Sequence, residues 1–229
     1  MKNKIKYIAF DADDTLWDNE IFFYEFEEKF SSLIRKYNPN HEISKDLFEM
    51  EMKNLQLYGY GVKGMVLCMI ELVCKSIDSK YTSDCILQVI QMGKDLLQKP
   101  VILLDDVTYT LAKLTNKYKL VLATKGDLLD QERKILKSGL NDYFHHIEIM
   151  SDKKSSDYSK LINRLDCSPE NFLMLGNSLN SDIIPVLELG AFAGYIPYHI
   201  TWKHEQCHED IAHPHFIKLN QIKEILNYL

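Results

Sequence analysis

Three aspartates, Asp11, Asp13 and Asp14, lie within four residues directly after a short apolar segment. Like charges this close repel one another, and they are stable together only where a cation or strong hydrogen-bond donors compensate them. Mg²⁺ is the natural partner of clustered carboxylates. The alternative is a solvated acidic turn in which Asp14 or Thr15 caps a following helix. Spacing alone does not choose between the two interpretations.

Three further polar segments each follow an apolar stretch and precede a helical pattern. Residues 124–127 present a hydroxyl, a lysine and a glycine where the N–H groups of a helix N-terminus favour an anion. Residues 152–154 contain a lysine pair, and one lysine would neutralise a carboxylate or phosphate. Residues 176–182 offer oxygen ligands and another carboxylate. Capped loops and surface lysines explain each segment singly, but together the segments hold the parts of a Mg²⁺–phosphate site.

The polar segments need elements that bring them together. Short apolar, β-prone stretches predict strands at 4–10, 119–124, 146–150, 171–175 and 192–196. Helical patterns fall between the later strands, at 128–137, 158–165 and 183–189. Alternating strands and helices indicate a parallel sheet covered on both faces, and ligands of such sheets bind at the carboxyl ends of the strands. We therefore expect the four polar segments to meet at one edge of the sheet.

The stretch from residue 19 to residue 97 has helical periodicity and no predicted strand, with breaks at Pro39 and in the glycine-rich run 58–64. It predicts an all-helical domain inserted between residues 1–18 and 98–229, which form an α/β core. Lys63 lies in the glycine-rich run beside two tyrosines. One interpretation is that the Lys63 ammonium contacts an anionic group of a substrate. The other is that Lys63 belongs to a surface turn between helices.

The composition argues against several classes of protein. The 229 residues are 46% hydrophobic and 26% charged, with 27 basic and 33 acidic residues, so a core is expected and dedicated nucleic-acid binding is not. No apolar run reaches the roughly 20 residues of a membrane-spanning helix, and the N-terminal apolar run is too short for a signal peptide. Five cysteines without CxxC spacing indicate reduced thiols and a cytoplasmic protein. Oligomeric state does not follow from the sequence.

One motif points to different chemistry. Residues 204–208 match HExxH, which binds zinc when it lies on a helix with a third ligand supplied by the fold. Here the motif follows the last predicted strand and has charged flanks, with Pro214 close behind. We therefore do not expect proteolysis, and we expect Trp202, near His204 and Glu205, to pack in a loop beside the active site.

Taken in order, the four polar segments resemble the motifs of the haloacid dehalogenase-like hydrolases, over nearly the whole chain. Residues 11–15 match the family's DxDx[TV] motif, and Thr124 matches its second-motif Thr or Ser. Lys153 best matches the family lysine that precedes a helix with an aromatic residue, with Lys154 as the alternative. Residues 176–182 match the acidic GDxxxxD motif, except that Asn177 replaces the first acid.

The resemblance implies an α/β fold with a Rossmann-like parallel sheet and an inserted helical cap. It implies a Mg²⁺-dependent phosphatase that acts on a small phosphorylated metabolite. Asp11 would be the nucleophile that forms an aspartyl-phosphate, Asp13 the acid and base, and Lys153 the residue that helps activate Asp11. The remaining assignments fall into two sets. The substrate would contact Thr124, Lys125, Gly126 and Lys63, and the metal would contact Asp11, Asp13, Asn177 and Asp182.

Alternatives to a phosphatase stay open. A phosphotransferase or mutase of the same fold would protect the aspartyl-phosphate from water. A non-catalytic phosphate-binding protein would result if Asn177 prevents metal binding, because an amide oxygen carries no charge. Dehalogenase activity is disfavoured, because dehalogenases of this family lack an acid two residues after the nucleophile, where this chain has Asp13.

Overall fold

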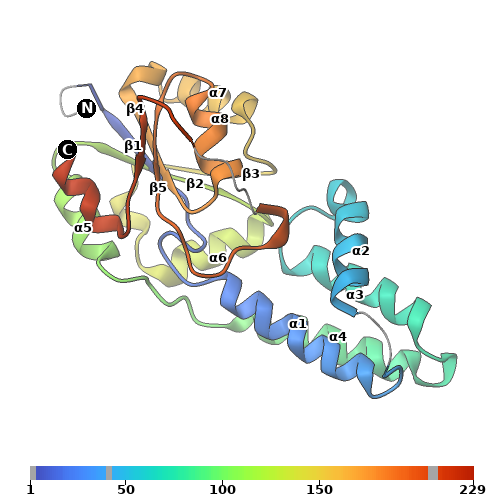
Figure 1. Ribbon diagram of the computed structural model, residues 1–229. Helices are drawn as coiled ribbons and strands as arrows, with labels where there is room; N and C mark the ends of the chain where they lie inside the picture. Colours follow the sequence, from blue (N-terminus) through green and yellow to red (C-terminus); the bar gives the residue numbers. More distant parts are fainter. Residues whose placement is uncertain (1–3, 40–42, 206–210) are drawn as a thin grey trace. The chain divides into compact units, whose positions relative to one another are not determined.

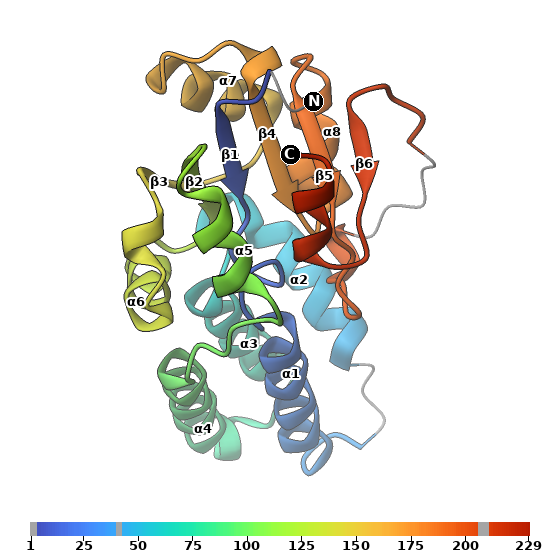
Figure 2. The same cartoon turned by 90° about the vertical axis from the view of Figure 1, so that its left-hand side faces the viewer.

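The computed structural model describes residues 4–39, 43–205 and 211–229. Its centre is a six-stranded, all-parallel sheet in the order β3-β2-β1-β4-β5-β6, which Figure 1 shows nearly edge-on and Figure 2 strand by strand. The strands are β1 (Tyr7–Phe10), β2 (Lys119–Lys125), β3 (His146–Met150), β4 (Phe172–Gly176), β5 (Phe192–Tyr195) and β6 (Phe216–Lys218). The predicted parallel α/β sheet is thus confirmed. The sequence pattern missed β6, because this edge strand has only three residues and pairs with β5 alone.

Eight α-helices accompany the sheet in the described residues. They are α1 (Glu20–Arg35), α2 (Ile43–Tyr58), α3 (Val62–Ser76), α4 (Ser79–Gln98), α5 (Val107–Leu114), α6 (Leu128–Ser138), α7 (Ser155–Arg164) and α8 (Ile184–Leu187). Helix α7 begins three residues before the predicted start, since Asp157 accepts a hydrogen bond from the Lys154 N–H in its first turn. A π-helical turn, Leu179–Ile183, leads directly into α8.

Alternate residues of β1 face opposite sides of the sheet. Ile8 and Phe10 belong to a core cluster with residues of α5 and the C-terminal turn Ile222–Asn227. Ala9 belongs to a second cluster, with residues of α7 and α8. All three β1 side chains are fully buried. The strand therefore reads as a continuous apolar run because helices cover both faces, as Figure 2 shows.

The strand order reverses at β1. From there the chain proceeds outward through β2 and β3, then returns to place β4 on the other side of β1. The Asp11 N–H donates to the Leu175 carbonyl oxygen at 2.8 Å, so the hydrogen bonding between β1 and β4 continues one residue past the end of β1. Such a reversal leaves a crevice outside the carboxyl ends of the two strands. The polar residues that follow β1 and β4 lie at this point.

The chain divides into two compact units. One comprises Met1–Glu20, Val101–Lys125 and Gln131–Leu229, and contains the sheet. The other comprises Ile21–Pro100 together with Gly126–Asp130. The described part of residues 21–100 has four helices and no strand, and this unit's own core cluster includes Phe30 and Met69. The expected boundaries, at residues 18 and 97, did not assign the short segment after β2 to the helical unit.

Lys63 lies in the first turn of α3, and the turn between α2 and α3 is confined to residues 59–61. Within the helical unit its ammonium pairs with the Asp127 carboxylate, with Nζ 2.9 Å from Oδ1. The same Asp127 oxygen accepts a hydrogen bond from the Asp130 N–H at 3.0 Å and so caps the start of α6.

None of the helices seen in the described residues has the length and apolar character needed to cross a membrane. The cysteines among them, Cys68, Cys74, Cys85 and Cys167, are free thiols.

A substitution at Gly194 tests the packing of the sheet. A Cβ at this β5 position would lie 2.5 Å from Leu175 Cδ2 of β4 and 3.3 Å from Ile217 Cγ1 of β6. We expect Gly194→Ala to lower the free energy of unfolding by about 1–3 kcal/mol, the usual cost of overpacking. Urea denaturation measures the change. Adding Leu175→Val removes the nearest colliding atom and should restore part of the loss, whereas simple addition of the two losses would contradict the packing argument.

Candidate active site

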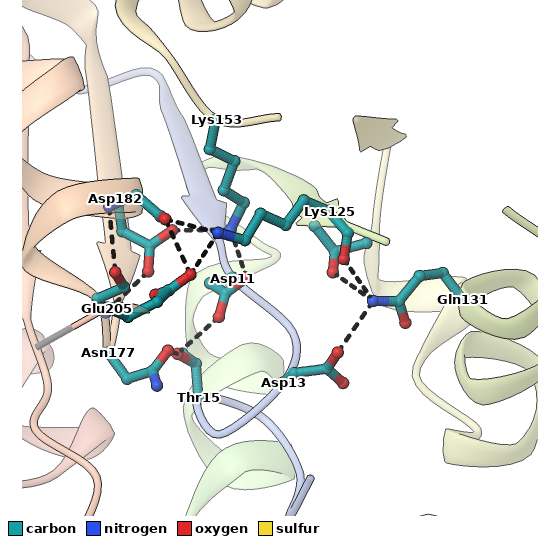
Figure 3. A network of polar contacts seen from close by, with 12 residues as sticks. Asp11, Asp13, Thr15, Lys125, Gln131, Lys153, Asn177, Asp182 and Glu205 are labelled. Carbon is teal, nitrogen blue, oxygen red and sulfur yellow. Dashed lines mark hydrogen bonds and ion pairs between the residues drawn. The ribbon is translucent and has the colours of Figure 1, made fainter. Parts of the chain in front are cut away.

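Lys153 is buried at the centre of the polar residues that follow the strands (Figure 3). Its ammonium contacts the Asp11 carboxylate and lies 2.7 Å from Asp182 Oδ1. The neighbouring Lys154 side chain is 74% exposed and pairs with Asp152 at 2.9 Å. The structure therefore places Lys153, and not Lys154, against the first aspartate.

Asp182 is held by several donors in addition to Lys153. Its Oδ2 accepts a hydrogen bond from the Ser178 N–H at 3.0 Å, and its Oδ1 lies 3.4 Å from the Tyr158 hydroxyl. A Cβ at Gly176 would lie 2.2 Å from Asp182 Oδ2. Only glycine leaves room for this carboxylate, which explains in physical terms why a glycine and an acid occur six residues apart in this segment.

The two carboxylates next to Lys153 shift its titration, and Asp182 also shifts that of Asp11. Burial raises the pKa of the Asp11 carboxyl to about 7, although the Lys153 ammonium acts in the opposite direction, and Asp182 adds to the rise. Burial by itself would lower the pKa of Lys153, but Asp11 and Asp182 raise it well above its ordinary value. Two carboxylates thus share one firmly held positive charge, and a bound cation would favour ionised Asp11.

Asn177 lies on the other side of Asp11. One terminal atom of its amide is 3.1 Å from Asp11 Oδ2 and 3.2 Å from the main-chain oxygen of Asp13, and the Thr15 hydroxyl is also 3.2 Å away. With nitrogen at this position the amide donates to these oxygens. With oxygen there, a carboxylate, a carbonyl and an amide oxygen converge, and these are the ligands that Mg²⁺ prefers.

The Asp13 carboxylate lies in a cage of donors. It accepts hydrogen bonds from Trp17 Nε1 at 2.7 Å and Gln131 Nε2 at 2.9 Å, and both of its oxygens lie 2.7 Å from Lys134 Nζ. Burial disfavours the charged form of Asp13. Lys134, supported by the other two donors, outweighs burial and holds the pKa of the carboxyl below its ordinary value.

Asp14 caps a helix and does not contact the Lys153 ammonium. Its side chain accepts hydrogen bonds from the N–H groups of Asn19 and Glu20 at 2.9–3.1 Å, at the start of α1. Burial raises the pKa of Asp14 to about 8, against the effect of these donors. Its backbone adopts φ 61°, a conformation that aspartate tolerates better than most residues. The capping alternative considered for the acidic turn thus describes Asp14.

Thr124 and Lys125, at the end of β2, face the same cluster. The Thr124 hydroxyl oxygen accepts a hydrogen bond from Gln131 Nε2 at 3.0 Å. Lys125 Nζ donates to Ser181 Oγ at 2.8 Å and forms a salt bridge with Glu205, which in turn lies 3.1 Å from Ser181 Oγ (Figure 3). Burial opposes the charge of Glu205, but Lys125 outweighs burial and lowers the pKa of that carboxyl.

Comparisons with known proteins identify the family. The model of the haloacid dehalogenase-like hydrolases matches residues 5–190. The chain belongs to the haloacid dehalogenase-like hydrolases. A solved family hydrolase from Xanthomonas campestris is 33% identical, with 98% of this chain and 96% of that chain covered and a TM-score of 0.83.

More distant relatives of this family match as well. A family hydrolase from Bacillus subtilis, solved with bound magnesium, is 15% identical, with 98% of each chain covered and a TM-score of 0.65. The glyceraldehyde 3-phosphate phosphatase of Methanothermobacter thermautotrophicus is 26% identical over 103 residues, which cover 42% of this chain and 45% of that protein. The matched region is therefore less than half the length of this curated relative.

Most of the site residues inferred from the family motifs meet in the unit that contains the sheet. The contacts above join Asp11, Lys153, Asp182, Asn177 and the Asp13 main chain, and Gln131 links Asp13 to Thr124. Gly126 leaves β2 with φ 143°, where a side chain would be strained. Lys63 and Gly126 belong to the other unit.

Sequence reasoning missed several residues of this hydrolase site. Trp17, Gln131 and Lys134 bind Asp13, and Glu205 binds Lys125. The spacing of Gln131 and Lys134, three residues apart on one helix, was a weak available signal. Glu205, which the sequence showed only as part of the HExxH match, forms a buried salt bridge with Lys125. Residues 206–208 of the HExxH match lie outside the described residues.

The adjacent lysines give a matched test of the buried charges. Lys153→Met leaves the Asp11 and Asp182 carboxylates without their shared positive charge, and we expect the free energy of unfolding to fall by about 3–5 kcal/mol. Lys154→Met removes only an exposed ion pair and should change it by less than about 1 kcal/mol. Urea denaturation at neutral pH compares the variants. Equal effects would show that the Lys153 contacts do not stabilise the site.

Proposed function

We propose that this hydrolase is a Mg²⁺-dependent phosphatase that cleaves a small phosphate monoester through an aspartyl-phosphate. The observation that carries the proposal is the buried contact of Asp11 with Lys153 at the strand-order reversal, with Asp13 and Asn177 alongside. The phosphatase among the relatives supports the choice of reaction. The reduced cysteines expected from the sequence are consistent with a cytoplasmic location, which stays a prediction.

In the proposed reaction an Asp11 carboxylate oxygen attacks phosphorus, and the bond from phosphorus to the leaving alkoxide oxygen breaks. Lys153 orients the nucleophile and compensates part of the charge around it. A water molecule then attacks the aspartyl-phosphate, the bond to Asp11 breaks, and inorganic phosphate leaves. Asp11 returns to its starting state.

Asp13 would move the protons. It would donate one to the leaving oxygen and later take one from the attacking water, so that no proton is gained or lost over the cycle. Its cage of donors holds it ionised, which suits the second step. For the first step it must carry a proton, and the negative charge of an adjacent phosphate monoester favours that form.

The donor set fits Mg²⁺. We propose that Asp11, the main-chain oxygen of Asp13 and the amide oxygen of Asn177 hold the ion. The Asn177 amide lies within 3.2 Å of the Asp11 carboxylate and the Asp13 main-chain oxygen, and a cation there would favour the amide orientation that turns the oxygen toward it. Asp182 is the weaker candidate, because Lys153 and the Ser178 N–H already engage its two oxygens. When bound, Mg²⁺ would offset the negative charge of the site and polarise the phosphoryl group.

The phosphate group would contact Thr124 and the end of β2. The Thr124 hydroxyl is buried next to Asp13 through their shared partner Gln131, and Lys125 adds a positive charge nearby. Gly126 would supply a main-chain N–H group. A role for Lys63 toward the non-reacting part of a substrate stays a prediction, since its ammonium pairs with Asp127.

A phosphotransferase or mutase is the second candidate, because the first half of its reaction uses the same groups. The two differ in what accepts the phosphoryl group. Fast transfer to an added sugar phosphate, outpacing hydrolysis, would favour the mutase. A non-catalytic phosphate-binding protein is the third, and lack of turnover across a panel of phosphorylated metabolites with Mg²⁺ present would favour it.

The nucleophile is tested with Asp11→Asn. An amide does not attack phosphorus at a useful rate, so we expect kcat for an aryl phosphate to fall at least about 10³-fold, and EDTA to abolish wild-type turnover. Beryllofluoride with Mg²⁺ should raise the Tm of the wild type and not of the variant, because it mimics an aspartyl-phosphate. An Asp11→Asn enzyme that keeps more than a few per cent of wild-type kcat overturns the assignment.

The metal ligand is tested with Asn177→Asp, which adds a charge next to the Asp11 carboxylate and the Asp13 main-chain oxygen. We expect Mg²⁺ to activate this variant at about tenfold lower concentration, corresponding to roughly 1.4 kcal/mol of added attraction. The Mg²⁺-dependent rise in Tm should grow in parallel. Asn180→Asp, at an exposed position of the same loop, is the control and should leave both quantities unchanged. An unchanged activation constant in Asn177→Asp would remove Asn177 from the metal site.

A further inference from the structure

Gln131, in α6, is 2% exposed and uses one nitrogen to contact three groups (Figure 3). Its Nε2 lies 2.8 Å from the Lys125 carbonyl oxygen, 2.9 Å from Asp13 Oδ2 and 3.0 Å from Thr124 Oγ1. The carbonyl and the ionised carboxylate can only accept hydrogen bonds. The orientation of the amide is therefore fixed, with its N–H groups toward these three oxygens.

This orientation determines what the Thr124 hydroxyl can do. An amide nitrogen does not accept a hydrogen bond, so the hydroxyl hydrogen points away from Gln131. Thr124 is 1% exposed, and the contact with Gln131 is the only hydrogen bond of its side chain within the part of the chain that the structure describes. Its hydrogen is a buried donor at the carboxyl end of β2, beside Asp13.

The other end of the Gln131 amide is unfavourable for stability. Its Oε1 is buried and receives no hydrogen bond from any described residue. An acceptor left in this state costs free energy that an apolar side chain of similar length would avoid. The contacts that Gln131 makes in the structure are therefore those of its N–H groups.

We propose that Gln131 is a positioning residue that directs the Thr124 hydroxyl toward a phosphoryl oxygen of the substrate. Its N–H groups face the Thr124 hydroxyl oxygen as well as the Lys125 carbonyl and the Asp13 carboxylate, so the hydroxyl hydrogen cannot be directed at Gln131. The hydroxyl is then left to donate to a tetrahedral oxyanion. This inference rests on the proposed function, because it assigns the phosphate position next to Thr124.

A double-mutant cycle tests the coupling of the two residues. Gln131→Met removes the N–H groups at similar size, and Thr124→Val removes the hydroxyl. We expect each single change to lower kcat/KM for an aryl phosphate by about tenfold or more, the value of one hydrogen bond. In the Thr124→Val background, Gln131→Met should cost at least about threefold less than in the wild type, because only its contacts with Asp13 and the Lys125 carbonyl then remain to be lost. Glu132→Gln, at the exposed neighbouring position, is the control.

Two results of the cycle with Gln131→Met would overturn the proposal. One is wild-type kcat/KM in Gln131→Met, and the other is a full tenfold loss in the Thr124→Val background, which would show that Gln131 acts independently of the hydroxyl. Tm values establish that the variants are folded. If Gln131→Met does not fold, the isosteric Gln131→Glu takes its place in the same cycle. Its carboxylate would accept the Thr124 hydrogen, so the loss should exceed tenfold, and an unimpaired Gln131→Glu refutes the inference.

Binding of orthovanadate, measured by calorimetry, separates this inference from the proposed function. Absence of turnover in the wild type would refute the phosphatase assignment, whereas the cycle can still be run on oxyanion affinity. There, Gln131→Met should weaken orthovanadate binding several-fold in the wild-type background and not in Thr124→Val. Equal affinity in all four proteins would refute the role of Gln131 even if the phosphatase assignment stands.

Discussion

The site depends on one buried ammonium group, that of Lys153, which holds two carboxylates at the carboxyl edge of the sheet. Asp11 follows β1 and Asp182 lies in the turn after β4, and these strands are neighbours because the strand order reverses there. Without a positive charge between them, two buried carboxylates would repel each other strongly. A side chain at Gly176 would collide with the Asp182 carboxylate. The glycine at the end of β4 is therefore needed for Asp182 to reach Lys153.

The three aspartates after β1 have different chemistry because their partners differ. Asp11 shares Lys153 with another carboxylate and keeps a raised pKa, whereas three donors around Asp13 hold its pKa low. Asp14 accepts hydrogen bonds from the N–H groups of Asn19 and Glu20 and so caps the start of α1. Residues of one type within four positions thus provide a candidate nucleophile, a candidate proton carrier and a helix cap.

Residues outside the strand ends hold the polar side chains of the site in place. Gln131 and Lys134 come from α6 and bind Asp13, while Glu205 comes from the segment between β5 and β6 and binds Lys125. None of these residues belongs to the family motifs that the sequence displays. Their polar contacts are mostly buried, where each hydrogen bond and charge pair has a larger effect than at the surface. The precision of the site therefore depends on elements outside the strand ends.

Local patterns in the sequence predicted the strands from β1 to β5, the helices between them and the four polar segments, because periodicity and adjacent residues report on neighbours along the chain. The edge strand β6 and the early start of α7 were not predicted. A strand of three residues and a helix start set by one capping contact show too little periodicity in the sequence. The choice of Lys153 over Lys154 required the fold, which buries one lysine and exposes the other. The same holds for the contacts of Asp13 with Lys134 and of Lys125 with Glu205, which join residues 121 and 80 positions apart. Pairings at such separations are made by the packing of the whole sheet and its helices, and no local spacing encodes them.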